Sequence, residues 1–171
     1  LIEIVKKIWS ETGLDVSITT NGFPASERAL KEVEDFVGEV RVSIHSLGSC
    51  TVLGKFINRR FDLGVNLLLM KHNASSLARI VEKCVRMGVK DFLVNSFRAL
   101  GRGANIRHME PTVEDHLQLG GIIEGLTHKA KFKVSGRVAS VLRRLIGLRF
   151  IPFEDVARGR IIAITVDRKV K

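Results

Sequence analysis

The feature that most constrains the fold is a regular alternation of helix-type and strand-type hydrophobic patterns along the first 100 residues. In the helix-type segments, apolar residues recur every three or four positions, which predicts helices with one buried face. In the strand-type segments they alternate with polar residues or form short continuous runs. The predicted helices span residues 1–12, 26–38, 55–63 and 75–87. The predicted strands span residues 15–20, 40–45, 65–71 and 91–97.

The connections between these strands are too long for hairpins, because most contain a helix-type segment that ends near a glycine. Parallel strands joined by right-handed crossovers are the simplest solution. The sequence therefore predicts an α/β protein, with either an open doubly wound sheet or a partial (β/α) barrel. In both architectures, function is expected where the strands end and the following loops begin.

The chain changes character after Pro111, so we expect a boundary between residues 1–110 and a C-terminal region, residues 111–171. In that region the pattern predicts helices over residues 112–126 and 134–146. A last strand is predicted over residues 160–166, followed by the start of a hairpin turn.

Positive charge is concentrated in this C-terminal part. The whole chain has a formal net charge of +10. From residue 126 onward, twelve Lys or Arg face three Asp or Glu, a net charge of +9. This fits either a surface that binds nucleic acid or another polyanion, or a solvated basic face. Because Phe132, Phe150 and Phe153 are the only aromatic residues there to stack on bases, nucleic acid is the less expected partner.

Several classes of protein are excluded or disfavoured. No apolar run reaches the roughly 18 residues needed to cross a bilayer, and residues 1–9 do not resemble a secretion signal. Cys50 and Cys84 form no Cys-x-x-Cys pair, which disfavours a disulfide framework or a zinc site and favours a reducing cytoplasm. Cys84 falls on the apolar face of a predicted helix and is expected in the core, whereas the pattern does not place Cys50.

All four predicted strands end in polar residues, although turn chemistry alone also favours Asn, Ser and Gly at such places. Two of these residues also have a structural interpretation that needs no functional role. Asn73 is suited to cap a helix, and Ser43 could form a hydrogen bond to a buried backbone group. The strand ends are Thr19-Thr20-Asn21-Gly22, Ser43-Ile44-His45-Ser46, Lys71-His72-Asn73 and Asn95-Ser96-Phe97-Arg98.

Two histidines, His45 and His72, follow different strands and could meet in a metal-dependent or acid–base site. Two histidines without a placed carboxylate form a weak pattern, and structural hydrogen bonding is the more common role. Arg98 and Arg102 flank a glycine-containing loop that could bind an anion, or could simply be exposed. The chain contains no Tyr, so it has no phenolic acid or tyrosyl radical.

Taken in order, the strand ends resemble the middle of radical S-adenosylmethionine enzymes over residues 1–103. The Thr19-Thr20-Asn21-Gly22 segment is similar to the TTNG that ends the family's third strand, and Val42-Ser43-Ile44-His45 is similar to its V-S-L-D motif. Residues 64–69 with Asn73 resemble the fifth strand and the following helix cap. Residues 98–103 resemble the P-x-G-R-A/G element after the sixth strand. Residues 157–170 resemble the lead-in to an auxiliary-cluster (SPASM-like) extension.

The chain also departs from this pattern. The Cys-x-x-x-Cys-x-x-Cys loop that binds the family's [4Fe–4S] cluster and its glycine-rich element belong upstream of what this chain contains. Two cysteines on unrelated elements cannot replace three converging thiolates, and the auxiliary-domain cysteines are absent as well. His45 stands where the motif has Asp. We therefore expect an internal and C-terminal fragment, running from about the family's second helix to its sixth strand in residues 1–110, with no cluster ligands of its own.

The resemblance implies that the intact protein uses S-adenosylmethionine and a [4Fe–4S] cluster to abstract hydrogen from a small-molecule or peptide substrate, with a reductant supplying one electron. It implies cofactor contacts for Thr20, Ser43, Asn66 and Phe97, of which Thr20 and Asn66 would face the barrel mouth. No catalytic or metal-binding residue is assigned in this chain, which is not expected to turn over alone. The alternative is a self-contained α/β module that binds a polyanion through its basic C-terminal third, with a salt-dependent affinity.

Overall fold

The computed structural model describes residues 2–23 and 25–146 of the chain. The elements follow one another as α1 (Ile2–Thr12), β1 (Val16–Thr20), α2 (Glu27–Val33), β2 (Val37–Ser43), the 3-10 helix η1 (Ser49–Lys55), β3 (Asp62–Leu69), α3 (Ala74–Arg86), β4 (Asp91–Ser96), the 3-10 helix η2 (Gly101–Met109), α4 (Val113–Leu126), β5 (Lys131–Val134) and α5 (Gly136–Ile146).

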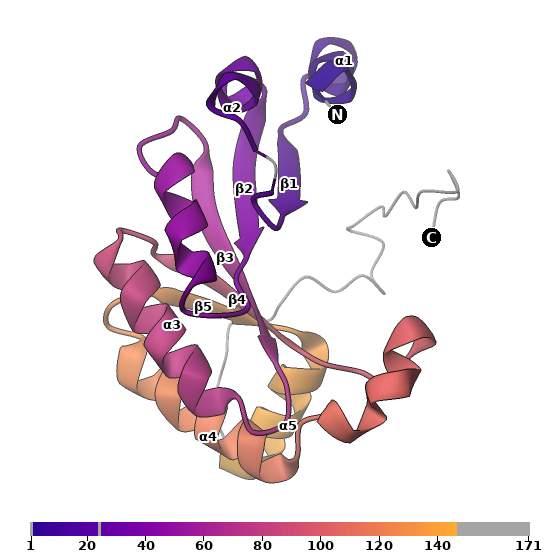
Figure 1. Cartoon of the computed structure of the whole chain (residues 1–171), viewed down its shortest axis with the longest axis vertical. Coiled ribbons are helices and arrows are strands. Elements are labelled where there is room, and N and C mark those ends of the chain that lie inside the picture. The colour runs from indigo at the N-terminus through magenta and orange to yellow at the C-terminus, as the bar shows by residue number, and fades with distance from the viewer. Residues whose placement is uncertain (1, 24, 147–171) are drawn as a thin grey trace.

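The strands form one parallel sheet in the order β1-β2-β3-β4-β5, as Figure 1 shows. Each strand pairs with the next one along the chain. The predicted α/β class and the parallel arrangement are therefore confirmed. Sequential parallel strands with intervening helices are the arrangement found in an arc of a (β/α) barrel, so a partial barrel is consistent with the sheet.

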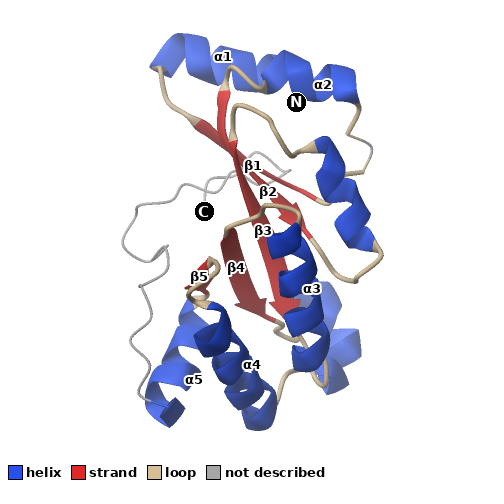
Figure 2. Cartoon of the chain, turned by 90° about the vertical axis from the view of Figure 1, so that its left-hand side faces the viewer, coloured by secondary structure: helices blue, strands red, loops and turns tan. Residues whose placement is uncertain are grey.

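One face of the sheet, here called the outer face, carries the core. Val42, Val65, Phe92 and Phe132 pair in register across β2 to β5 and are buried. The rings of Phe92 and Phe132 stack with their centroids 5.4 Å apart. Apolar residues of the helices join the same continuous cluster. In Figures 1 and 2, η1 and α3 lie together on one side of β3.

The opposite face, here called the inner face, carries the alternate residues of each strand. Across its middle, Thr19, Arg41, Gly64 and Asp91 lie in register on β1 to β4. Two positions further along β2 and β3, Ser43 pairs with Asn66. The inner face is therefore more polar than the outer face.

Helix α2 is shorter than predicted. It begins with Ser26 as N-cap, whose side chain accepts from the Ala29 backbone N–H, and it ends at Val33. Val37 and Gly38 were assigned to this helix by their spacing, but they begin β2. Gly38 packs beside Asp15, since a Cβ there would lie 3.1 Å from the Asp15 Cβ. The prediction that Gly38 ends the helix is therefore wrong, because the apolar residues up to Val42 serve the sheet.

Two further boundaries differ from the prediction. The helical segment expected at residues 55–63 is a 3-10 helix seven residues long at Ser49–Lys55, and β3 already begins at Asp62. The glycine ends of two other helices are confirmed: Gly13 (φ 65°) follows α1 and Gly88 (φ 97°) follows α3. Glycine is favoured at these places because it adopts positive φ without steric cost.

Strand β5 was not predicted, because Val134 was assigned to the helix that follows. Phe132 and Val134 point to the core, while Lys131 and Lys133 lie on the inner face. The sheet thus continues past residue 110, and the proposed division of the chain at that residue stays a prediction. The strand and hairpin turn expected in residues 160–169 lie outside the described residues.

No helix among residues 2–23 and 25–146 is long and apolar enough to cross a membrane.

Candidate functional site

Ser43 and Asn66 lie side by side on the inner face, near the carboxyl ends of β2 and β3. The Ile44 backbone N–H donates to the Asn66 carbonyl oxygen over 3.0 Å, which continues the pairing beyond β2. The Asn66 side-chain oxygen, Oδ1, is buried and accepts no hydrogen bond from the described residues. A buried acceptor without a donor is unfavourable, so this atom is suited to receive a donor from a ligand.

Phe97 continues the β4 ladder, since its backbone N–H donates to the Leu69 carbonyl oxygen over 2.9 Å. Alternation along the strand puts it on the inner face, four residues beyond Leu93, which is the β4 residue paired with Asn66. Its ring lies against Gly103, where an added Cβ would come within 3.2 Å of two ring atoms. The glycine at position 103 thus lets the loop after β4 fold back over the ring.

Thr20 lies on the outer face, away from Ser43 and Asn66, because it pairs with Val42. Its hydroxyl accepts from the Gly22 backbone N–H over 3.0 Å. The side chain lines an apolar cavity of about 270 Å³ together with Ile18, Val40 and residues of α1 and α2. The structure therefore brings Ser43 and Asn66 together and separates Thr20 from them; a cofactor contact by Thr20 stays a prediction.

The turn after β1 has the geometry its sequence predicts. Gly22 adopts φ 77°, and the Asn21 side-chain oxygen accepts from the Phe23 backbone N–H over 3.0 Å. A Cβ on Gly22 would lie 2.6 Å from a methyl carbon of Val52. Glycine is thus required here both for the turn and for its close packing on η1.

Asn73 precedes α3 as its N-cap residue, but its side chain makes no capping hydrogen bond to that helix. It faces back toward β3 instead. Its Oδ1 accepts from the Met70 backbone N–H and its Nδ2 donates to the Leu68 carbonyl oxygen, both over 2.9 Å. Asn73 therefore fixes the loop after β3 rather than the start of the helix.

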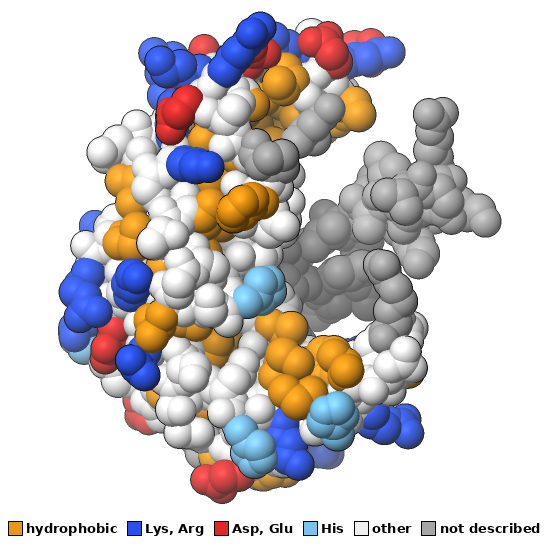
Figure 3. All heavy atoms as spheres, viewed as in Figure 1, with side chains coloured by type: hydrophobic (Ala, Val, Ile, Leu, Met, Phe, Trp, Pro, Cys, Tyr) orange, Lys and Arg blue, Asp and Glu red, His pale blue; other side chains and the backbone are white. Residues whose placement is uncertain are grey.

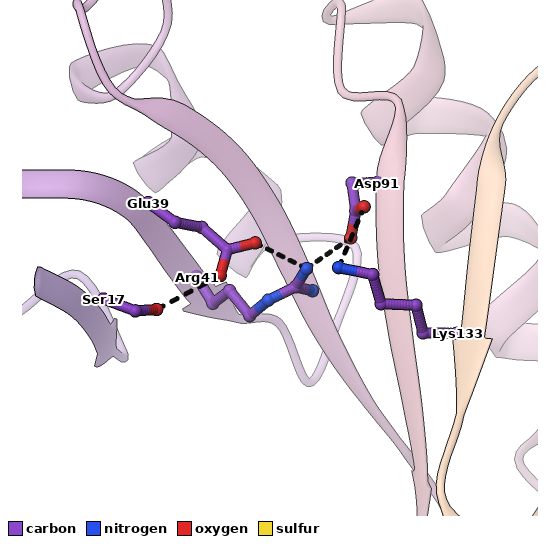
Figure 4. Close-up of polar contacts among 5 residues, drawn as sticks. All are labelled: Ser17, Glu39, Arg41, Asp91 and Lys133. Carbon is purple, nitrogen blue, oxygen red and sulfur yellow. Dashed lines mark hydrogen bonds and ion pairs between the residues drawn. The ribbon is translucent and has the colours of Figure 1, made fainter. Parts of the chain in front are cut away.

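A network of charged side chains that sequence reasoning missed crosses the inner face (Figure 4). The Arg41 Nη2 donates to Glu39 over 2.6 Å and to Asp91 over 2.5 Å. Lys133 lies 3.4 Å from the other Asp91 oxygen, and the Ser17 hydroxyl donates to Glu39 over 3.1 Å. The network thus joins β1, β2, β4 and β5.

Gly64 explains how Arg41 on β2 reaches Asp91 on β4. Gly64 pairs with Arg41 on one side and with Asp91 on the other. A Cβ at this position would lie 3.0 Å from the Arg41 Cζ and Nη1 atoms. The guanidinium group therefore lies across the glycine, where any larger residue would displace it.

The pKa of Arg41 is raised above its ordinary value by its acidic neighbours. Burial by itself would lower the pKa, but the hydrogen bonds and charges of Asp91 and Glu39 outweigh that effect. The guanidinium is therefore charged. Its Nη1 atom is nevertheless buried without a hydrogen-bond partner among the described residues.

His45 and His72 are both exposed, and each follows its strand as predicted. The His45 backbone N–H donates to the Ser49 hydroxyl, and the His72 backbone N–H donates to Asp115 over 2.7 Å. Within the described ranges, no group of three or more His, Cys, Asp or Glu is placed to hold a metal ion. The structure thus offers no support for the alternative metal site.

A third histidine, His116 on α4, is buried and was not recognised from the sequence. Its Nδ1 lies 2.7 Å from the Thr112 carbonyl oxygen and its Nε2 lies 3.4 Å from the Ser96 hydroxyl at the end of β4. The neighbouring Asp115 accepts from Thr112 and from the His72 backbone N–H. These two residues join α4 to the loop that follows β3 and to the end of β4.

The pKa of Asp115 is lowered by these hydrogen bonds. Burial alone would raise it, but the backbone N–H and hydroxyl of Thr112 and the backbone N–H of His72 all stabilise the charged carboxylate. Thr112 and Asp115 form a capping box at the start of α4.

The two cysteines do not fit a [4Fe–4S] cluster. Cys50 on η1 and Cys84 on α3 are buried, and their sulfur atoms lie 3.9 Å apart. Burial, together with the nearby Cys50, raises the pKa of Cys84 to about 12, so its thiol stays protonated. A cluster requires several thiolates around one centre, and the chain contains no third cysteine. The expectation that Cys84 lies in the core is confirmed.

Lys and Arg side chains are scattered over the face drawn in Figure 3, among acidic and apolar side chains, and do not form one continuous basic patch there. Much of the basic sequence after residue 126 lies outside the described residues. The described residues on this face therefore give no support to a polyanion-binding surface.

No protein-family model matches the sequence, and no curated protein matches it. Solved structures of Streptococcus suis SuiB do match. SuiB bound to S-adenosylmethionine is 13% identical with a TM-score of 0.64, over 88% of this chain and 38% of SuiB. SuiB bound to its precursor peptide SuiA is 13% identical with a TM-score of 0.66, over 88% and 39%. A further SuiB structure is 11% identical with a TM-score of 0.66, over 88% and 40%.

This likeness shows that the chain shares its fold with part of SuiB. It does not show the expected auxiliary-cluster extension, which stays a prediction. The chain spans about two fifths of the length of the SuiB chains. Activity, cofactor and substrate are therefore matters for proposal.

Proposed function

We propose that the chain is part of a radical S-adenosylmethionine enzyme and that its inner face positions S-adenosylmethionine and the substrate for hydrogen abstraction. The proposal depends on the pair formed by Ser43 and Asn66 at the carboxyl ends of adjacent parallel strands. Ligands of parallel α/β folds bind at this end of the sheet. The SuiB structure solved with S-adenosylmethionine supports the choice of ligand.

The chemistry of the two side chains fits this ligand. The buried Asn66 Oδ1 needs a hydrogen-bond donor, and the ribose hydroxyls and amino groups of S-adenosylmethionine are donors. The Ser43 hydroxyl both donates and accepts, so it suits a ribose or carboxylate oxygen beside it. Phe97 offers an aromatic ring for the adenine, and this ring lies against Gly103.

When S-adenosylmethionine is bound and cleaved by one electron, it supplies a 5'-deoxyadenosyl radical that removes hydrogen from a substrate. The residues of this chain bind and orient the ligand. Cys50 and Cys84 do not fit the cluster that delivers the electron, so we assign no redox step to this chain. A peptide is the favoured substrate, because a SuiB structure holds its precursor peptide SuiA. A reductant and a cytoplasmic location are further parts of the proposal.

Isothermal titration of the full chain with S-adenosylmethionine tests the proposal. We expect saturable binding at one site per chain. Asn66→Ala should weaken the affinity about tenfold, because a hydrogen bond to a buried acceptor contributes roughly 1.5 kcal/mol. Ser43→Ala should weaken it in the same direction.

Asn105→Ala is the matched control, since Asn105 is an exposed asparagine in η2. It should bind as the unchanged chain does. A folded chain that shows no saturable binding, or an affinity that Asn66→Ala leaves unaltered, would contradict the proposed function.

A further inference from the structure

Arg41 lies directly below the proposed cofactor residues on the inner face. Ser43 follows Arg41 by two residues on β2, and Asn66 follows Gly64 by two residues on β3. Two residues along a strand correspond to about 6.7 Å on the same face. The Arg41 guanidinium, which lies across Gly64, therefore forms the next layer toward the amino ends of the strands.

The Arg41 guanidinium is held by two ion pairs, but one of its nitrogen atoms makes no hydrogen bond to the described residues. Both of its close ion pairs, to Glu39 and to Asp91, involve the Nη2 atom. The Nη1 atom has no partner among the described residues, although the Arg41 side chain is only 7% exposed. A buried, oriented N–H donor without an acceptor is unfavourable in a folded protein, and it indicates a place for an acceptor that the described residues do not supply.

The surroundings of Arg41 remain accessible. Glu39 is 30% exposed, Asp91 is 24% exposed and Lys133 is 26% exposed. The network therefore borders solvent on the inner face.

The charges of the network indicate which acceptor fits. Arg41 and Lys133 are positive, and Glu39 and Asp91 are negative, so the four charges balance. A carboxylate or phosphate would bring an uncompensated negative charge next to two carboxylates, which is costly in a partly buried place. A neutral carbonyl oxygen accepts from the Nη1 atom without adding charge, and it has no proton of its own left unpaired.

We infer that Arg41 is a substrate-binding residue whose Nη1 atom donates to a neutral amide carbonyl oxygen of the substrate. This inference deepens the proposed function and rests on it, because it assigns the layer below Ser43 and Asn66 to the substrate. It makes an uncharged amide, such as a peptide bond or a carboxamide side chain, the group that the inner face recognises.

Nuclear magnetic resonance of the full chain with ¹⁵N-labelled arginine side chains tests this inference. N-methylacetamide serves as the probe for an amide, and acetate serves as the probe for an anion. We expect N-methylacetamide to shift the Arg41 side-chain signals saturably and acetate to leave them in place. Arg41→Lys, which keeps the charge and removes the Nη1 atom, should weaken amide binding at least about tenfold, as followed in this variant by the backbone amide signals of β2 and β3.

Arg59→Lys is the matched control. The Arg59 side chain is also largely buried, at 12% exposure, but it is fully engaged by Glu27, Glu34 and the Lys55 carbonyl oxygen. This variant should bind N-methylacetamide as the unchanged chain does. The titration of the unchanged chain does not depend on how either variant folds.

Arg41 signals that fail to respond to N-methylacetamide would overturn the inference, as would an equal response to acetate or a contact to bound water alone. Titration of the same sample with S-adenosylmethionine separates the two proposals. Cofactor binding without amide binding overturns only the role of Arg41. Loss of cofactor binding with amide binding retained contradicts the proposed function and leaves Arg41 as an amide-binding residue.

Discussion

Gly64 leaves room for the Arg41 side chain, and this allows the network of charged residues to cross the inner face. Without a Cβ at position 64, the guanidinium of Arg41 lies flat across β3 and reaches Asp91. The requirement at this glycine is close approach, because its φ lies outside the positive range in which glycine is specially favoured.

We predict that Gly64→Ala lowers the free energy of unfolding by about 1–3 kcal/mol, the usual cost of an extra methyl group in a packed place. The new methyl group would push the Arg41 guanidinium away from Asp91 and leave buried charges poorly paired. Urea denaturation followed by circular dichroism measures the change.

Gly121→Ala is the control for this experiment. Gly121 lies in α4 with open space around its Cα, so alanine should raise stability by up to about 1 kcal/mol. Equal stability of Gly64→Ala and the unchanged chain would contradict the close-approach argument.

The candidate site could be predicted in part from single residues. Thr20, Ser43, Asn66 and Phe97 were named through the family resemblance of the strand ends; the structure puts Ser43, Asn66 and Phe97 on the inner face and Thr20 on the outer face. Arg41 was missed because its neighbours Val40 and Val42 make the segment look like an ordinary buried strand. A charged residue inside such a run is itself a signal, since burying it requires partners on neighbouring strands.

At the scale of elements, α4 depends on a carboxylate at its first turn. Asp115 closes the capping box with Thr112 and also accepts from the loop after β3. Because these contacts lower the pKa of Asp115 in the folded chain, they stabilise the fold fully above the ordinary aspartate pKa of about 3.9. The contribution is lost as the pH falls through the lowered folded value.

We predict that Asp115→Asn costs about 1–3 kcal/mol at neutral pH, the range for hydrogen bonds to a buried charged group. The difference from the unchanged chain should shrink as the pH falls below about 4. Urea denaturation over a pH series measures both effects. Glu114→Gln is the control, because Glu114 is exposed in the same turn; if it shows the same pH-dependent loss, the role assigned to Asp115 is wrong.

The elements themselves were predictable to different degrees. Strand β3 and helix α3 carry long, unambiguous patterns, and both were found within a few residues. Strand β5 has only four residues, two of them lysines, and its last valine also suits the spacing of α5. Helix α2 was overextended because the apolar spacing of Phe36 and Val37 continues without a break while the backbone turns into β2. Packing in the sheet determines where β5 forms and where α2 ends, and local hydrophobic periodicity does not reveal that packing.

At the scale of the whole molecule, one hydrophobic cluster includes residues from α1 to α5 and residues of the five-stranded sheet. The only tryptophan, Trp9, is on α1 beside Phe36, with ring centroids 5.4 Å apart in an edge-on arrangement. Its fluorescence therefore reports on the β1 end of the sheet, whereas far-ultraviolet circular dichroism reports on every helix.

We predict that both signals change at the same urea concentration, because a continuous core favours cooperative unfolding. Gly64→Ala should move both midpoints together. A fluorescence transition at lower urea than the circular dichroism transition would mean that α1 and β1 unfold separately from the rest of the described fold.

The position of the Arg41 guanidinium above Gly64 also makes the two positions interdependent in evolution and engineering. A side chain at position 64 becomes acceptable only when position 41 gives up arginine, so single changes at either place should be selected against more strongly than a paired change. Sequences that replace both Arg41 and Gly64 would still form β2 and β3. They would lose the guanidinium on the inner face, and with it any preference for uncharged carbonyl groups.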